Sequence, residues 1–274
     1  MGMQRLDPVQ LLHAETPLRV WSLIVTVFGD AVMDRGARVD PPAVWTADLL
    51  ALMTLLGIEP GIARTNLSRL VANGTLLRDK TGRNTFYRLS EASRTAFAKA
   101  SGQIYGRIPA SPTGRFALAI TERAENRAEA RVTLEADGWR FISPTIAIRP
   151  GHEGEPASRL PGGTIRAEAD ATPELIAAVR EAWQIDDLNR GYRRFLTAFA
   201  PTLSGAPPDP AHATALRTVA VHFFRRLALR DPILPHHSLP DDWAGVEARA
   251  LFVALMQHLQ PASEAWLAAH RFRD

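Results

Sequence analysis

Apolar residues recur every three or four positions near the start of the chain, the spacing expected of a helix with one buried face. This spacing predicts a first helix that begins at Pro17, is capped by Thr16 and is ended by Gly29 after Phe28. After a turn-rich stretch, a second helix is predicted to begin at Thr46 or Asp48 and to run through Leu56. Residues 1–14 lack a continuous apolar run and are interpreted as a short tail.

A third helix is predicted over residues 62–72, within the segment 58–74, where a short turn leads into a helix that Asn73 and Gly74 end. At about 100° per residue, one side of this helix is apolar and the other is polar. The apolar side consists of Ile62, Ala63, Leu67, Leu70 and Val71. The polar side consists of Arg64, Thr65, Ser68 and Arg69.

The hydrophobic period then changes to that of strands. Residues 75–78 and 85–89 are predicted to form a hairpin with a basic tip at Lys80, Gly82 and Arg83. A helix over residues 91–105, capped by Ser90, follows. This order of helices and hairpin is typical of a winged helix-turn-helix domain, which we expect over residues 15–106.

The middle of the chain has a mixed pattern and begins after a linker over residues 106–114. Strands are predicted over residues 115–121, 139–142, 145–149 and 164–169, with a surface helix over residues 122–136. The pattern indicates a small, ferredoxin-like α+β domain over residues 107–171.

Only helices are predicted beyond residue 172. They begin with the capping sequence Thr172-Pro173-Glu174 and continue over residues 186–199, 211–229, 243–259 and 261–270. We therefore expect a helical C-terminal domain over residues 172–274. The predicted fold class is α+β and helix-rich: an N-terminal winged helix-turn-helix, a ferredoxin-like middle domain and an all-helical C-terminal domain.

The distribution of charge along the chain indicates a function for the predicted N-terminal domain. The formal net charge is only +3, which favours no partner by itself. Between residues 64 and 94, however, basic side chains far outnumber acidic ones. The basic ones are Arg64, Arg69, Arg78, Lys80, Arg83, Arg88 and Arg94, against Asp79 and Glu91. A basic helix followed by a basic hairpin is the pattern of a surface that binds double-stranded DNA.

Composition narrows the remaining possibilities. The chain has no cysteine, which excludes disulfides, thiolate metal sites and cysteine nucleophiles. No apolar stretch reaches the roughly 20 residues of a membrane span, and the N-terminus does not resemble a signal peptide. A cytoplasmic protein without membrane contact is the expectation.

Catalytic and metal-binding motifs are missing from the sequence. It contains no phosphate-binding GxxxxGK[ST] loop, no GxGxxG turn and no GxSxG elbow. Six C-terminal histidines lack the spacing of a metal site, and we interpret them as ordinary surface or helix-end residues. They are His212, His222, His236, His237, His258 and His270. We therefore expect no enzyme activity, no metal and no cofactor.

An alternative from another class stays open. The middle domain could be a nucleic-acid-processing enzyme that uses the winged helix for docking, with catalytic carboxylates among Glu122, Glu125, Glu129 and Asp137. These residues are better explained as charges on the surface of a helix.

Several segments resemble the PaaX-type transcriptional repressors of phenylacetic acid catabolism. Residues 21–30 resemble the first helix of that family, 57–74 its helix-turn-helix, 87–92 the end of its wing and 104–106 its domain exit. The most specific similarity is C-terminal, in Arg-Asp-Pro-Ile-Leu-Pro at residues 230–235 and Leu-Pro-Asp-Asp-Trp-Ala-Gly at residues 239–245. The middle domain matches only loosely. By itself, the 230–235 run is better explained as a structural stop after a helix than as a binding site.

The resemblance implies a homodimeric repressor that binds a double-stranded DNA operator and is released by an aryl-coenzyme A thioester, such as phenylacetyl-CoA or another acyl-CoA. DNA contact is then expected from Arg64, Thr65, Ser68, Arg69, Lys80 and Arg83. Aromatic and basic residues that suit an aryl-CoA ligand are Trp183, Tyr192, Arg193 and Arg194. A helix with one buried and one solvated face is the plainer explanation of that group.

Overall fold

The computed structural model describes residues 8–14, 18–32, 43–106, 112–152, 160–205 and 208–272. The chain forms two compact units. The first consists of residues 1–106, 194–226 and 246–274, and the second of residues 107–193 and 227–245. The fold is a mixture of helices and two small antiparallel sheets, which confirms the α+β class. The division of the chain into three domains stays a prediction.

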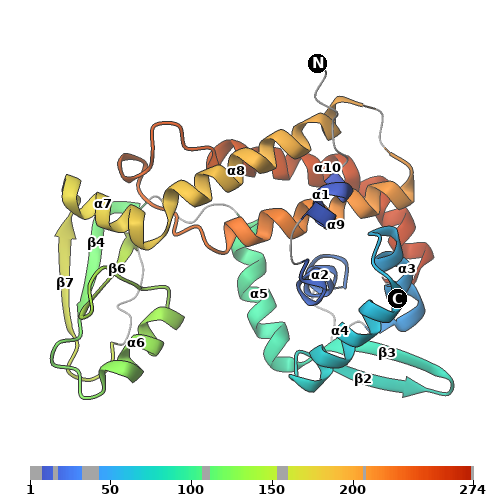
Figure 1. Cartoon of the computed structure of the whole chain (residues 1–274), viewed down its shortest axis with the longest axis horizontal. Helices are drawn as coiled ribbons and strands as arrows, with labels where there is room; N and C mark the ends of the chain where they lie inside the picture. The colour runs from blue at the N-terminus through green and yellow to red at the C-terminus, as the bar shows by residue number, and fades with distance from the viewer. Residues whose placement is uncertain are drawn as a thin grey trace. The chain divides into compact units, whose positions relative to one another are not determined.

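The N-terminal part of the first unit contains helices and one small sheet (Figure 1). Its elements are α1 (Pro8–Ala14), α2 (Val20–Val27), the π-helical turn η1 (Phe28–Val32), β1 (Val44–Trp45), α3 (Thr46–Leu55), α4 (Pro60–Ala72), β2 (Leu76–Thr81), β3 (Asn84–Leu89) and α5 (Glu91–Tyr105). The strands lie antiparallel in the order β1–β3–β2. Gly82 and Arg83 form the two-residue hairpin turn, and Gly82 has a φ of +61°.

The structure corrects several predicted elements here. Residues 8–14 form a helix rather than a tail, because Leu12 is fully buried in the unit. Gly29 does not end the first helix, which continues through residue 32 as a π-helical turn. The strand β1 was not predicted. The predicted cap Thr16 lies outside the described residues.

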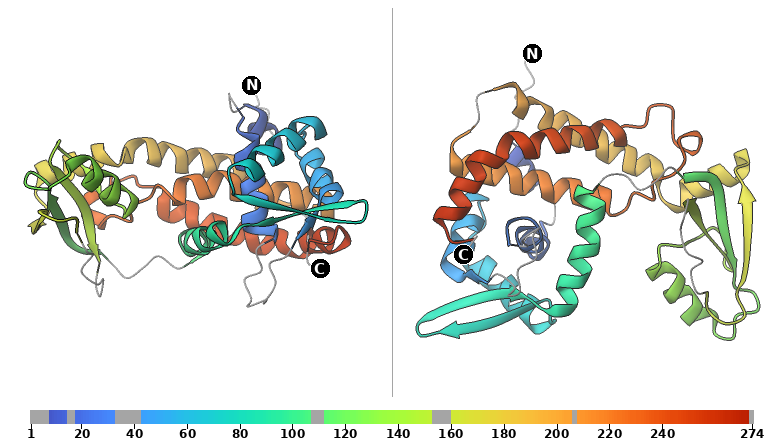
Figure 2. Two further views of the ribbon diagram at one scale, coloured as in Figure 1. Left: turned by 90° about the horizontal axis from the view of Figure 1, so that it is seen from below. Right: turned by 180° about the vertical axis from the view of Figure 1, so that it is seen from behind.

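The rest of the first unit is a layer of long helices. These are the end of α8 (Ile185–Phe199), the 3₁₀ turn η2 (Ala200–Ser204), α9 (Pro210–Ala228) and α10 (Gly245–Ala269). Phe224 of α9 stacks on Phe252 of α10 with ring centroids 4.0 Å apart. The views in Figure 2 show α9 and α10 side by side. The predicted break at Pro261 is wrong, because α10 continues through this residue although proline removes one backbone hydrogen bond.

The second unit contains the other sheet. Its elements are β4 (Pro112–Ile120), α6 (Arg127–Ala136), β5 (Arg140–Phe141), β6 (Ile146–His152), β7 (Ile165–Asp170), α7 (Pro173–Ala182), the start of α8, and the 3₁₀ turn η3 (His236–Ser238). All neighbouring strands are antiparallel, in the order β5–β6–β4–β7. The core of the sheet includes Trp139 and Leu134, both almost completely buried. Helix α6 begins five residues later than predicted, at the Asn126 cap.

Candidate nucleic-acid interface

Helix α4 is held against its unit by a narrow apolar edge. The helix begins at Pro60, which needs no backbone N–H in the first turn, and Asn73 and Gly74 follow its end. The buried residues of the helix are Ala63, Leu67 and Leu70. Two positions of the predicted apolar side differ: Ile62 is 47% exposed and Val71 is only partly buried. The anchored side of α4 is therefore narrower than the sequence predicts.

The opposite side of α4 is exposed and contains no acidic residue. Arg64, Thr65, Ser68 and Arg69 all lie on it in solvent. The Thr65 hydroxyl donates to the Gly61 carbonyl at 3.0 Å, so its oxygen is left to accept hydrogen bonds. Within the part of the chain that the structure describes, neither arginine forms an ion pair. Their guanidinium donors are thus available to an external partner.

The hairpin beside α4 adds further positive charge. Helix α4 packs against β2, and Lys80 and Arg83 are both exposed at the far end of the hairpin. Neither has an acidic partner among the described residues. The acidic Asp79 is instead bound by Arg88, with Nε donating to Oδ2 at 2.6 Å. The tip therefore keeps its positive charge.

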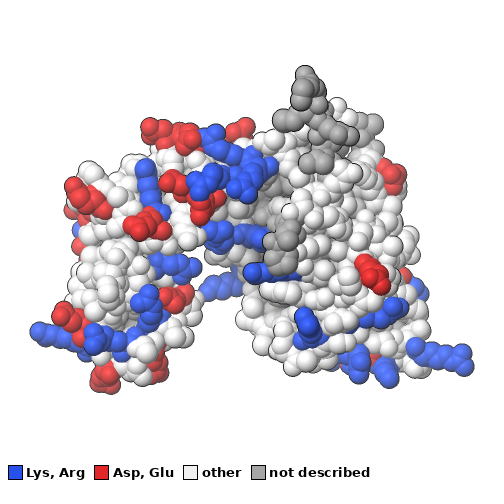
Figure 3. Space-filling view, in the orientation of Figure 1, with Lys and Arg blue, Asp and Glu red and all other residues white. Residues whose placement is uncertain are grey.

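Basic side chains gather over α4 and the hairpin in the space-filling view (Figure 3), at the lower edge of the first unit. Seen from below, the hairpin extends beyond the helices of its unit (Figure 2). The structure therefore places six of the sequence-predicted residues on two neighbouring, exposed elements. They are Arg64, Thr65, Ser68, Arg69, Lys80 and Arg83.

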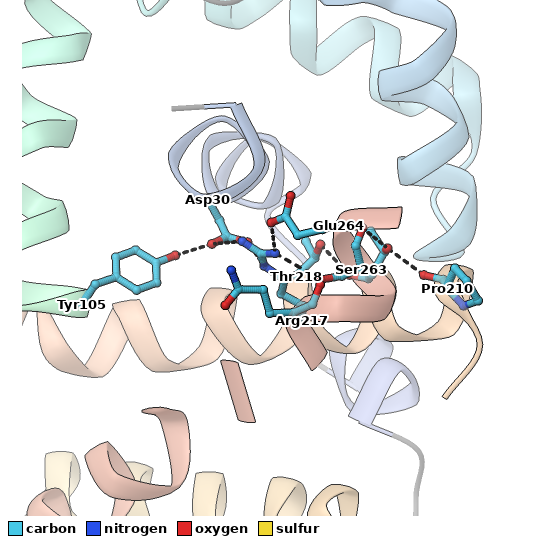
Figure 4. Close-up of polar contacts among 9 residues, drawn as sticks. Asp30, Tyr105, Pro210, Arg217, Thr218, Ser263 and Glu264 are labelled. Atoms are coloured by element: carbon cyan, nitrogen blue, oxygen red, sulfur yellow. Dashed lines mark hydrogen bonds and ion pairs between the residues drawn. The ribbon is translucent and has the colours of Figure 1, made fainter. Parts of the chain in front are cut away.

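Behind this surface lies a buried polar network centred on Arg217 of α9 (Figure 4). Its guanidinium donates to both carboxylate oxygens of Asp30 in η1, at 2.8 and 3.2 Å. Its remaining nitrogen donates to Ser263 Oγ at 3.1 Å and Glu264 Oε1 at 2.7 Å, both in α10. The Tyr105 hydroxyl at the end of α5 donates to the same Asp30 at 2.7 Å. The network joins four elements from both halves of the chain.

The charge of Arg217 is secured by these partners. Burial by itself would lower the pKa of Arg217, but attraction to Asp30 and hydrogen bonds to Asp30 and Glu264 raise it above its ordinary value. Arg217 and Asp30 are 7% and 5% exposed, so the pair is largely removed from solvent.

A second buried group involves α9 and α2. Arg225 donates to Thr26 Oγ1 at 2.8 Å and to the Ser22 carbonyl at 2.8 Å. The ring of His222 hydrogen-bonds the same Thr26 hydroxyl at 2.9 Å. Burial, followed by repulsion from Arg225 and Arg226, lowers the pKa of His222 to about 3. Burial and then Arg226 lower the pKa of Arg225 to about 10. His222 is therefore neutral at physiological pH.

Two further arginines connect the C-terminal helices with the N-terminal elements. Arg249 of α10 donates to the carbonyls of Gln103 and Ile104, where α5 ends. Arg271 donates to both carboxylate oxygens of Asp48 in α3 and lies over the Trp45 ring, 3.9 Å from its centroid. Sequence reasoning missed all these connections, because nothing local marks an arginine whose partner lies more than a hundred residues away.

The candidate effector residues have unequal surroundings. In the second unit, Trp183 and Tyr192 are buried, and the Tyr192 hydroxyl donates to Asp231 at 2.9 Å. Arg193 is exposed and pairs with Asp242. Arg194, which belongs to the first unit, is exposed. Two of the four candidates are thus buried and two are exposed.

The remaining candidates for chemistry are dispersed. Asp137 pairs with Arg149 at 3.4 Å, and Glu129 accepts from the Asn126 cap at 3.4 Å. No group of three histidine or carboxylate side chains able to hold a metal ion occurs among the described residues. No helix in the described ranges is both long and apolar enough to cross a membrane.

The described residues thus define an α+β protein with an exposed basic helix and a basic hairpin. Two family models match the chain: the PaaX-like protein over residues 19–93 and the PaaX-like protein C-terminal domain over residues 183–269. The chain belongs to this PaaX-like family, as its sequence motifs predict. It is 29% identical to the transcriptional repressor PaaX of Escherichia coli (strain K12) over 290 aligned residues, which cover 97% of this chain and 88% of that protein.

A solved structure has a similar fold. The uncharacterized protein Rv0674 from Mycobacterium tuberculosis superposes with a TM-score of 0.53 and 21% sequence identity. The match covers 89% of this chain and 97% of that chain. At this identity the likeness concerns the fold alone.

Proposed function

We propose that this protein is a DNA-binding transcriptional repressor of an aromatic, phenylacetate-type catabolic operon. The observation that carries the proposal is the acid-free, exposed side of α4 next to a hairpin whose tip keeps its positive charge. The similarity to a transcriptional repressor over nearly the whole chain supports the same function.

In this proposal the elements from α2 to α5 are a winged helix-turn-helix. Helix α4 enters the major groove, where Arg64 or Arg69 donates two hydrogen bonds to a guanine. Thr65 and Ser68 reach base edges or phosphates. The hairpin is the wing, and its Lys80 and Arg83 bind phosphates or the minor groove.

The proposal also includes a homodimer and an effector. Two copies of α4 would read half-sites separated by one or more helical turns of about 34 Å. The strand order β5–β6–β4–β7, with α6 between β4 and β5, supports a ferredoxin-like second unit. An aryl-CoA thioester would bind the part of the chain that includes Arg193 and favour a state that no longer fits the operator.

Because Trp183 and Tyr192 are buried, they would contact the effector only after the chain around them rearranges. Arg193 and Arg194 are exposed and can reach phosphate groups without such a change.

The test is binding to the DNA upstream of the protein's own gene, measured by fluorescence anisotropy at moderate salt. We expect tight binding to this duplex, weaker binding to a shuffled duplex of the same composition, and release by phenylacetyl-CoA. Equal binding to both duplexes, or none to either, would contradict the repressor function. Binding without release by any acyl-CoA would contradict only the effector.

A further inference from the structure

Arginines from the C-terminal helices hold separate elements of the N-terminal part. Arg217 and Arg225 of α9 hold η1 and α2. Arg249 of α10 holds the end of α5, and Arg271, just after α10, holds α3. Two of these elements, α2 and α3, pack directly against α4, and α3 also packs against β3, while α4 itself keeps its polar side exposed.

Of these four arginines, Arg217 is the one whose side-chain position is most tightly constrained by its partners. It binds both oxygens of Asp30, a geometry that fixes the orientation of the two side chains as well as their distance. The two residues are 187 positions apart in the sequence. A buried ion pair adds little net stability compared with apolar residues of similar size, because desolvation offsets the attraction. Its physical effect is directional: it selects one arrangement of the elements it joins.

The elements joined through Asp30 are those that position the DNA-binding surface. Asp30 lies in η1, the continuation of α2, and α2 packs directly against α4. Tyr105, which shares Asp30 with Arg217, is the last residue of α5, and α5 directly follows the hairpin strand β3. One carboxylate, which α9 holds in place, therefore joins the helix segment that continues α2 to the end of α5.

We propose that Arg217 is a positioning residue for DNA recognition, and that α9 and α10 belong to the DNA-binding unit. Through Asp30 it positions α2, on which α4 packs, and the end of α5, so that α4 and the hairpin packed on it reach one duplex together. The inference rests on the proposed repressor function and extends it: recognition by residues 60–89 requires a residue from the C-terminal part of the chain.

The experiment uses the full chain with two substitutions, Asp30→Asn and Arg217→Met. This pair removes both charges and leaves no unpaired ion from the pair in the interior, while Glu264 is partly solvated. A matched control, Arg115→Met with Asp170→Asn, removes an exposed pair on the sheet of the second unit. The dissociation constant is measured for the upstream duplex and for a shuffled duplex, together with the midpoint of thermal unfolding.

We expect the double variant to bind the upstream duplex about tenfold more weakly. Binding to the shuffled duplex should change by less than about twofold, since the exposed cations that meet phosphates are all retained. The control should resemble the wild type on both duplexes. A smaller fraction of folded protein would weaken both kinds of binding by one factor, so the ratio of the two constants separates positioning from a purely structural role.

Unchanged binding to the upstream duplex, or an equal loss on both duplexes, would overturn the inference. Should the double variant fail to fold, Arg217→Lys keeps the charge but not the two-point geometry, and the same selective loss is expected from it. Failure of the wild type to distinguish the duplexes would instead refute the repressor function itself, so the two results can be told apart.

Discussion

The arginines of α4 and those of α9 and α10 lie in one compact unit but in opposite surroundings. Arg64 and Arg69 project into solvent and meet no carboxylate among the described residues, whereas Arg217 is almost completely buried between two. The exposed residues contribute little to folding, because surface charges in water interact weakly. The buried residue fixes geometry. Arginine thus has two roles in this unit: Arg64 and Arg69 are available for binding at the surface, and Arg217 fixes the arrangement of elements in the interior. Mutations of the two kinds of arginine should therefore have separate effects on binding and on stability.

The largest effect is expected from breaking the buried pair on one side only. Arg217→Met leaves the carboxylate of Asp30 buried without its main partner, which costs about 3–5 kcal/mol of unfolding free energy. Urea denaturation followed by circular dichroism measures this change. The matched substitution Arg115→Met, at an exposed pair, should cost less than about 1 kcal/mol. A loss below about 1 kcal/mol for Arg217→Met would show that the network is not tightly desolvated.

The buried histidine of α9 should make the protein sensitive to acid. The pKa of His222 is about 3 when folded and near 6.5 when unfolded, so the unfolded chain binds the extra proton first as the pH falls. Above about pH 6.5, His222 leaves the free energy of unfolding unchanged. It reduces stability progressively toward pH 3, by about 2 kcal/mol at pH 5.

Replacing this histidine tests the effect directly. His222→Gln should flatten the dependence of unfolding free energy on pH between 8 and 5. Parallel pH profiles for His222→Gln and the wild type would mean that His222 is not held neutral by burial.

On the exposed side, Arg69→Ala should weaken binding to the upstream duplex and leave stability unchanged. Removing a two-point hydrogen bond to guanine costs about 1–3 kcal/mol of binding free energy. Anisotropy titrations with single base-pair changes in the duplex give the measurement, because discrimination should relax at one position only. A uniform loss across all duplexes would assign Arg69 to phosphate binding instead.

The smallest effect is expected at the hairpin tip. Replacing Lys80 and Arg83 by alanine should weaken binding to all duplexes alike. It should also lower the slope of log affinity against log salt by about 0.9 for each phosphate that is no longer neutralised. A slope that stays at the wild-type value would remove the hairpin from the DNA interface.

Local structure in the DNA-facing region could be predicted from the sequence. The bounds of α4 agree within two residues, because Pro60, the apolar spacing and Asn73-Gly74 all act on neighbouring positions. The hairpin is predicted as well, although its strands extend further toward Gly82 than expected. That these residues bind DNA stays a prediction.

The long-range organisation could not be predicted. The pairing of Arg217 with Asp30 has no periodic signature, because each residue fits a polar position on its own helix. The π-helical turn that presents Asp30 has no local signal in the sequence that we could use either. The helix α1 was missed for a related reason: its single buried residue, Leu12, is stabilised by packing and not by any pattern in seven residues.

The most direct test of the account is to place a DNA-cleaving probe on α4. The chain has no cysteine, so Ser68→Cys allows an iron–EDTA group to be attached at one defined position. The account predicts strand cuts confined to the upstream site and centred where α4 enters the major groove. The same probe at Val132→Cys, 69% exposed on α6, should give none. Equal cutting from both positions, or no cutting from Ser68→Cys on a bound duplex, would contradict recognition by α4.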